Sequence, residues 1–257
     1  MAVATIAASP SRLLKDAVTP AHSEPTNAST RKTAVLVALL FLTATVTFSL
    51  ADALIKGVLN HSDYLLSAST HTHRLEAGAL LALIEGPATV GIAVLLFPLL
   101  KRTSEPLALA FVGLRIAEIA AALLYVATPL LAIKLSDGIH DGTVTASSSR
   151  DLGPLLSDIR GVAITLIYVL TSLGGAILAY LLYRSQLVPR LIAILGLIGY
   201  PILLLGCALS VFNVGSLTSG AGLASLVPGG LFELALPIWL LARGFAFESQ
   251  DQVPIED

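Results

Sequence analysis

Charged residues are scarce in this chain: Asp, Glu, Lys and Arg make up 12% of its 257 residues, whereas a soluble globular domain has about 25%. Hydrophobic residues make up 55%, and the mean hydropathy is +0.85. A soluble protein of this size needs more polar side chains than that to cover its surface. The 15 basic and 17 acidic residues leave a net charge of −2, which excludes a basic nucleic-acid-binding protein. The composition therefore predicts a protein whose main partner is the lipid bilayer and which binds no nucleic acid.

Residues for familiar chemistry are also missing. Cys207 is the only cysteine, and one cysteine forms neither an intramolecular disulfide nor a Cys-x-x-Cys site. The sequence has no HExxH motif, no GxSxG motif and no Walker-type glycine loop. No histidine lies in a long apolar stretch, which excludes haem ligation between two membrane helices. We therefore expect no catalytic residue, metal site or cofactor, and an intramembrane enzyme is the least supported hypothesis for the function.

Long apolar segments are what the sequence does have. A bilayer core about 30 Å thick needs roughly 20 apolar residues in a helix, and six segments reach that length without the two-residue alternation of a membrane β-barrel. The predicted fold is an all-α, polytopic bundle of six transmembrane helices within residues 31–245. The predicted spans are about 33–53, 77–100, 107–133, 159–183, 191–211 and 222–241.

Basic residues are distributed unequally between the two sides of the predicted bundle, nine against five. One side holds Arg12, Lys15, Arg31, Lys32, Lys101, Arg102, Arg184, Arg190 and Arg243. The other side holds Lys56, Arg74, Lys134, Arg150 and Arg160. Cytoplasmic loops carry the excess of Lys and Arg, so we expect both termini in the cytoplasm and a multi-pass protein of the inner (plasma) membrane.

The segments outside the spans are polar. Residues 1–30 have no apolar run typical of a signal peptide and are predicted to form a flexible cytoplasmic tail, and residues 246–257 a short acidic tail. The outer loop at 136–157 contains two Asp-Gly pairs and a serine run, which favour turns. The first outer loop holds His61, His71 and His73, and the sequence leaves open whether they are solvated or bind a metal.

Four ionisable residues lie well inside the predicted spans: Glu85, Arg115, Glu118 and Glu233. Each would cost at least about 2.5–3.5 kcal/mol if it faced lipid at the centre of a helix. Glu118 lies roughly 16 Å along its helix from the start of the span, close to the bilayer midplane. We therefore expect all four side chains to turn toward the interior of the bundle and to find partners there.

The charges of these four residues do not balance. Arg115 and Glu118 are three residues apart and can pair on one helix face, but one guanidinium faces three carboxylates. A low-dielectric interior disfavours the ionised form of a carboxylate that lacks a partner. We therefore expect at least one of Glu85, Glu118 and Glu233 to carry a proton at neutral pH, or to be neutralised by a bound cation.

Two functions from different classes agree with this cluster. The first is binding or transport of a small cation, a proton or a polar solute at the four residues, because ionisable groups inside membranes commonly mark such sites. The alternative is a non-enzymatic structural or partner-interaction protein in which the buried charges only lock the helix packing. The sequence does not identify the solute, a protein partner or the oligomeric state.

One hairpin of the sequence resembles a known family. It reads Leu181-Leu182-Tyr183-Arg184-Ser185-Gln186-Leu187-Val188-Pro189-Arg190, followed by Ile194-Leu195-Gly196-Leu197-Ile198-Gly199. With Glu85, Arg115-x-x-Glu118, and Glu233 followed by Trp239 and Gly244-Phe245, it is similar to a bacterial family known as domain of unknown function number 4386. The resemblance covers roughly residues 31–245. It implies a six-helix integral membrane protein and supplies no activity.

Overall fold

The structure, a computed structural model, describes residues 27–246 except for 213, 215–216 and 218–219. This part of the chain contains helices and no strand. The long helices are α2 (Asn27–Leu59), α4 (Thr72–Leu100), α5 (Glu105–His140), α6 (Ala146–Ser185), α7 (Arg190–Val211) and α8 (Gly220–Ala242). A short helix α3 (Tyr64–Ser67) and a 3₁₀ turn η1 (Ala68–His71) join α2 to α4. All six long helices are long and apolar enough to cross a membrane, which confirms the predicted six-helix membrane bundle.

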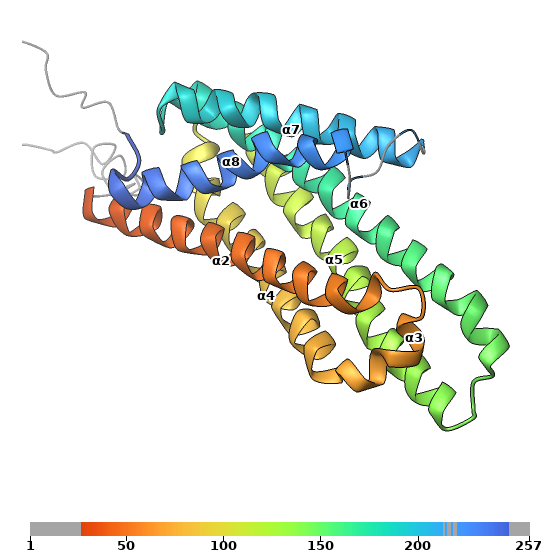
Figure 1. The fold of residues 1–257 in the computed structure, drawn as a ribbon. Coiled ribbons are helices and arrows are strands. Elements are labelled where there is room, and N and C mark those ends of the chain that lie inside the picture. The colour runs from red at the N-terminus through yellow and green to blue at the C-terminus, as the bar shows by residue number, and fades with distance from the viewer. Residues whose placement is uncertain (1–26, 213, 215–216, 218–219, 247–257) are drawn as a thin grey trace, which may run out of the picture.

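The six long helices form a closed ring. Each packs against its neighbours along the chain, in the order α2, α4, α5, α6, α7 and α8, and α8 packs back onto α2 (Figure 1). Because every helix has two neighbours in this ring, side chains from all six can point into one central space.

Two of the long helices extend far beyond the apolar segments that the sequence identified. α5 continues to His140 and α6 begins at Ala146, so the predicted turn-rich loop over 136–157 is wrong for most of that segment. Thr145 caps α6 by accepting a hydrogen bond from the backbone N–H of Ser148 at 3.3 Å. Hydropathy reports only the stretch that crosses the bilayer, whereas a capped helix can continue into water.

The chain ends lie partly outside the described residues. α2 begins at Asn27 and therefore extends four residues into the segment predicted as a tail. Residues 1–26 and the acidic residues 247–257 are outside the described part of the chain.

The apolar interior is divided into two main clusters along the bundle. We call the first the basic-end core; it contains Phe41, Leu96 and Phe232, among others, and lies where α2 begins and α8 ends. The opposite-end core lies where α2 ends and α4 begins, and it contains Ile55 and Leu75. The buried Glu85 and Thr89 of α4 and Arg115 and Glu118 of α5 lie at the level between these two cores.

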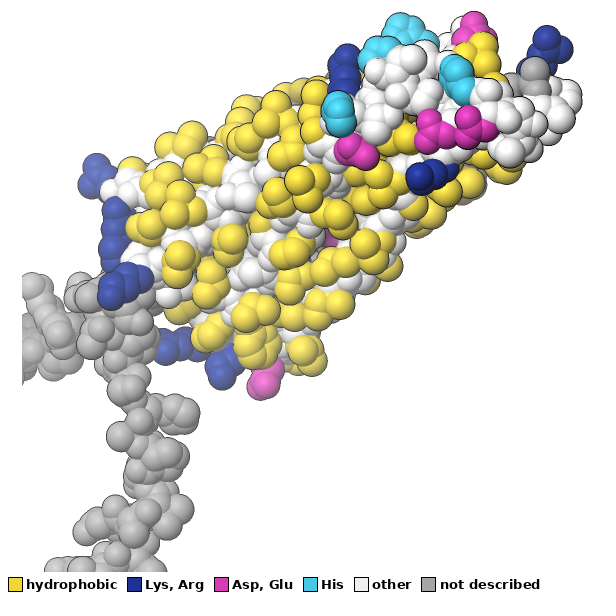
Figure 2. All heavy atoms as spheres, turned by 90° about the horizontal axis from the view of Figure 1, so that it is seen from below, with side chains coloured by type: hydrophobic (Ala, Val, Ile, Leu, Met, Phe, Trp, Pro, Cys, Tyr) yellow, Lys and Arg dark blue, Asp and Glu magenta, His cyan; other side chains and the backbone are white. Residues whose placement is uncertain are grey.

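Charged side chains lie at the two ends of the bundle, with a broad apolar belt between them (Figure 2). Among the described residues, the basic end carries seven Lys and Arg and one acidic residue, whereas the opposite end carries five basic and seven acidic residues and four histidines. This distribution is the one from which we predict that the basic end faces the cytoplasm, and that orientation stays a prediction.

Candidate functional site

The four ionisable residues that the sequence singled out line one cavity of about 230 Å³. All six long helices contribute to its wall, and the cavity lies at the level between the basic-end core and the opposite-end core. Glu85 comes from α4, Arg115 and Glu118 from α5, and Glu233 from α8. The expectation that these side chains turn into the bundle therefore agrees with their positions.

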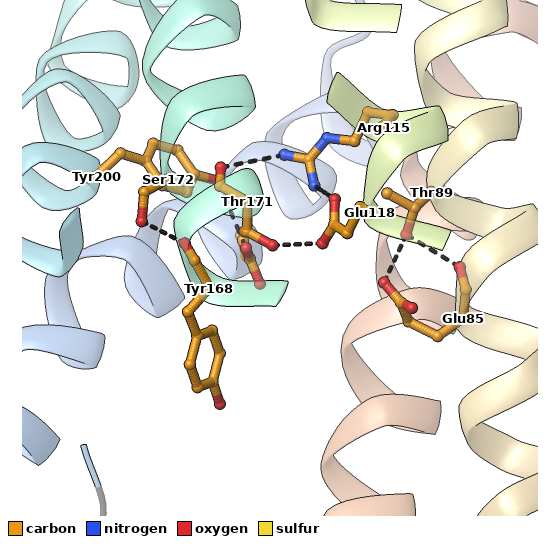
Figure 3. A network of polar contacts seen from close by, with 9 residues as sticks. Glu85, Thr89, Arg115, Glu118, Tyr168, Thr171, Ser172 and Tyr200 are labelled. Atoms are coloured by element: carbon orange, nitrogen blue, oxygen red, sulfur yellow. Dashed lines mark hydrogen bonds and ion pairs between the residues drawn. The ribbon is translucent and has the colours of Figure 1, made fainter. Parts of the chain in front are cut away.

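Arg115 and Glu118 form an ion pair on α5, as their spacing predicts. The Nη1 atom of Arg115 lies 2.7 Å from Oε2 of Glu118, and both side chains are buried. The pair is joined to α6, because the Thr171 hydroxyl donates to Oε1 of Glu118 and Nη2 of Arg115 donates to the Thr171 carbonyl at 3.4 Å. The guanidinium also lies 5.5 Å from the centre of the Phe111 ring. This side chain is therefore held on three sides (Figure 3).

Glu85 has a different kind of partner. The Thr89 hydroxyl, one turn further along α4, lies 2.8 Å from Oε1 of Glu85 and 2.9 Å from the Glu85 carbonyl oxygen (Figure 3). Glu85 is buried, and among the described residues no basic side chain lies within 4.0 Å of its carboxylate. A neutral hydroxyl thus provides its hydrogen bond, while the charge of the ionised form has no counterion.

Glu233 is held through the contact between α7 and α8. A Cβ added to Gly199 would lie 2.6 Å from the backbone nitrogen of Gly229, so only glycine allows the two helices to approach this closely. The approach brings the buried Tyr200 hydroxyl to 3.5 Å from Oε1 of Glu233, a long hydrogen bond. Within the described chain, Glu233 also has no basic side chain within 4.0 Å.

The charge imbalance expected from the sequence is therefore concentrated on two residues. Of the three carboxylates, Arg115 forms an ion pair with that of Glu118 alone. Glu85 and Glu233 have hydroxyl partners, and both line the same cavity. Whether each is protonated or neutralised by a cation stays a prediction.

Sequence reasoning missed a second polar cluster beyond the cavity. Arg160, which the sequence places on the outer side of the bundle, lies on α6 and is only 7% exposed. Asp52 accepts a hydrogen bond from Tyr125 at 3.1 Å and lies 2.5 Å from Nζ of Lys56 and 3.8 Å from Nη2 of Arg160. Arg160 Nη1 donates to Asn60 at 3.3 Å. The four-residue spacing of Asp52 and Lys56, which allows an ion pair on one helix face, was the one sequence signal for this cluster.

Aromatic rings separate this second cluster from the cavity. The Phe48 ring lies 6.0 Å from that of Tyr125 and 6.1 Å from that of Tyr168. Phe48 and Tyr168 also line the cavity, so they form its wall toward the opposite end of the bundle.

The loop histidines have local contacts. His71 Nδ1 lies 3.0 Å from the Ser67 carbonyl oxygen, and His73 Nδ1 lies 3.5 Å from Oε2 of Glu76. His61 is exposed. In the part of the chain that the structure describes, no three His, Cys, Asp or Glu side chains gather closely enough to hold a metal ion.

Comparison with known proteins agrees with the resemblance noted in the sequence. The family described as "Domain of unknown function (DUF4386)" has a model that matches residues 36–244. This region contains most of α2, the whole of α4 to α8, and all four charged residues of the cavity. Neither the curated proteins nor the solved structures contain a match to the chain. The chain is a multi-pass integral membrane protein and belongs to the DUF4386 family.

Proposed function

We propose that this protein binds a cation in its central cavity, at Glu85 and Glu233, and moves that cation or a proton across the membrane. The observation that carries the proposal is the pair of cavity-lining carboxylates without a basic partner among the described residues.

The physical reason is the cost of uncompensated charge. An isolated carboxylate in a low-dielectric interior is strongly unfavourable, and proteins pair it, protonate it or place it beside a cation. Thr89 and Tyr200 provide hydrogen bonds to Glu85 and Glu233 but no charge. A bound proton or cation supplies the missing positive charge, so its occupancy is coupled to the protonation of these carboxylates.

Arg115 and Glu118 have a positioning role in this proposal. Their ion pair, tied to Thr171, fixes one positive and one negative charge on the α5 side of the cavity. The guanidinium is held away from Glu85 and Glu233 at more than 4.0 Å. These two carboxylates therefore stay available for an exchangeable ion rather than forming permanent pairs with Arg115.

The alternative, a structural clamp, agrees with one part of the cavity. The Arg115–Glu118 pair and its two bonds to Thr171 connect α5 to α6, as a packing clamp would. The clamp does not explain Glu85, which is hydrogen-bonded to Thr89 of its own helix α4. It predicts that Glu→Gln variants change stability and leave transport unaffected.

Proton flux into proteoliposomes separates the two functions. A potassium gradient with valinomycin drives protons inward, and a trapped pH-sensitive dye reports their entry. We expect at least a tenfold loss of flux in Glu85→Gln and in Glu233→Gln. Glu76→Gln is the matched control, because Glu76 is an exposed residue of α4 outside the cavity. Unchanged flux in both cavity variants, or wild-type flux equal to that of empty liposomes, would overturn the proposal.

A further inference from the structure

The side of the cavity wall that α2 and α8 form includes exposed lining residues. The lining residues on α4 and α5 are buried, whereas Gly230 on α8 is partly exposed and Ser49 on α2 is exposed. At the basic end α2 and α8 are joined, since Arg31 donates to the carbonyls of Leu240 and Leu241 at 3.1 and 2.6 Å. Away from that end the two helices diverge (Figure 1). We call this exposed side of the cavity wall, at Ser49 on α2 and Gly230 on α8, the mouth.

The mouth faces lipid. The residues beside it include Val46 and Leu50 on α2 and Leu223 and Val227 on α8, and each of the four is at least half exposed. Exposed apolar side chains on a membrane-spanning helix are solvated by lipid tails, which are as apolar as Leu itself. A molecule that reaches the carboxylates through this mouth therefore comes from the bilayer.

The wall of the cavity is largely apolar. Phe41 and Phe48 of α2, Phe111 of α5 and Leu203 of α7 line the same cavity as Glu85. The inorganic cation Ca²⁺ takes six to eight oxygen ligands, whereas no three His, Cys, Asp or Glu side chains gather closely enough to hold a metal ion in the described residues. A cavity lined by both carboxylates and aromatic rings can bind an organic ammonium ion, because the carboxylates pair with its charge and the rings contact the cation and its apolar part.

We propose that the cation bound in this cavity is an amphipathic organic ammonium ion, with its charged group at Glu85 and Glu233 and its apolar chain in the mouth between α2 and α8. This inference rests on the proposed cation-binding function and adds the chemical class of the ligand.

Gly230 gives direct access to the mouth. It lines the cavity, and a Cβ added to it would meet no heavy atom within 4 Å. A larger side chain at this position therefore fits without disturbing the fold and occupies the space of the ligand's chain. Gly113 on α5 has equally open surroundings, is exposed and does not line the cavity, so it is the matched control.

The test is the affinity of the purified protein in nanodiscs for straight-chain ammonium ions from methyl- to octylammonium, measured calorimetrically with empty nanodiscs subtracted. Each methylene buried in the mouth should tighten binding about fourfold, from about 0.8 kcal/mol per buried methylene. The Glu85→Gln/Glu233→Gln double variant should lose binding of the whole series. Gly230→Leu should abolish most of the dependence on chain length, whereas Gly113→Leu should leave it unchanged.

The outcomes separate this inference from the proposed function. If affinity is independent of chain length while the double variant still abolishes binding, the amphipathic ligand is wrong and the cation site stands. A chain-length dependence that persists in Gly230→Leu would overturn the location of the chain in the mouth. If no ammonium ion binds and the Gln variants keep wild-type proton flux, both proposals fail.

Discussion

Removing Arg115 should destabilise the protein more than removing its partner Glu118. Arg115→Gln leaves three carboxylates in one cavity with no positive charge, whereas Glu118→Gln leaves the guanidinium with Glu85 and Glu233 in the same cavity. A symmetrical ion pair would predict equal losses for the two single variants. The excess of carboxylates makes the losses unequal, and their order is the prediction.

The magnitude follows from the contacts that are lost. Breaking a buried pair by removing one partner costs about 3–5 kcal/mol, and Arg115 also loses its contact with the Phe111 ring, which contributes about 0.5–2 kcal/mol. Protonation of a carboxylate relieves part of the cost, so we expect a loss of about 3 kcal/mol for Arg115→Gln. Glu118→Gln should cost about 1 kcal/mol, since the remaining charges can rearrange around the guanidinium. The double variant should cost less than Arg115→Gln alone.

Cys207 provides the assay. It is the only cysteine and is fully buried, so a thiol-reactive fluorogenic maleimide reports the temperature at which the bundle opens. A loss of 3 kcal/mol corresponds to a decrease of roughly 6–12 °C in the unfolding temperature for a domain of this size. Glu76→Gln should leave the unfolding temperature unchanged. Equal decreases for Arg115→Gln and Glu118→Gln, or a larger one for Glu118→Gln, would refute the argument from charge imbalance.

Three further predictions use the same thermal assay. Gly199→Ala should destabilise the protein by about 1–3 kcal/mol, because the added Cβ would meet the α8 backbone at 2.6 Å. Gly113→Ala, with open surroundings, should instead stabilise it by up to about 1 kcal/mol. Equal effects of the two substitutions would contradict the close contact between α7 and α8. Arg31→Gln should cost about 1 kcal/mol through the loss of two hydrogen bonds to α8 carbonyls, and an unchanged unfolding temperature would exclude this link. Asp52→Asn should cost more stability than Arg160→Met, because the loss of the Asp52 carboxylate leaves both Lys56 and Arg160 without their anionic partner. The reverse order would show that Arg160 depends on other partners.

Much of the fold was accessible from composition and spacing. A helix that must satisfy its own backbone in lipid has a fixed minimum length, so six apolar segments predicted six spans. The same constraint identified the cavity residues, because a charge at mid-span has to turn inward. The three-residue spacing of Arg115 and Glu118 also predicted their ion pair, which the structure confirms at 2.7 Å.

The missed features depend on contacts between residues distant in the chain. Thr171 and Tyr200 belong to residue types that are common in membrane helices, and only the ring of helices brings them to Glu118 and Glu233. Arg160 lies 108 residues after Asp52, so no local pattern connects them. The polar extensions of α5 and α6 carry no hydropathy signal, because beyond the bilayer a helix is specified by caps and local hydrogen bonds.

The division of the apolar interior into two cores has a mechanical consequence. Three membrane-spanning helices contain a proline close to the cavity. In α4, Pro87 lies two residues after the cavity-lining Glu85. In α7, Pro201 follows Tyr200, and in α8, Pro228 precedes the cavity-lining Gly229. Each proline removes one backbone hydrogen bond from its helix, at the level where side-chain packing is also interrupted. Three of the six spans therefore lack a backbone hydrogen bond close to the cavity, and these places are joints at which bending would change the width of the cavity. A bilayer that becomes thinner or thicker acts on the same joints.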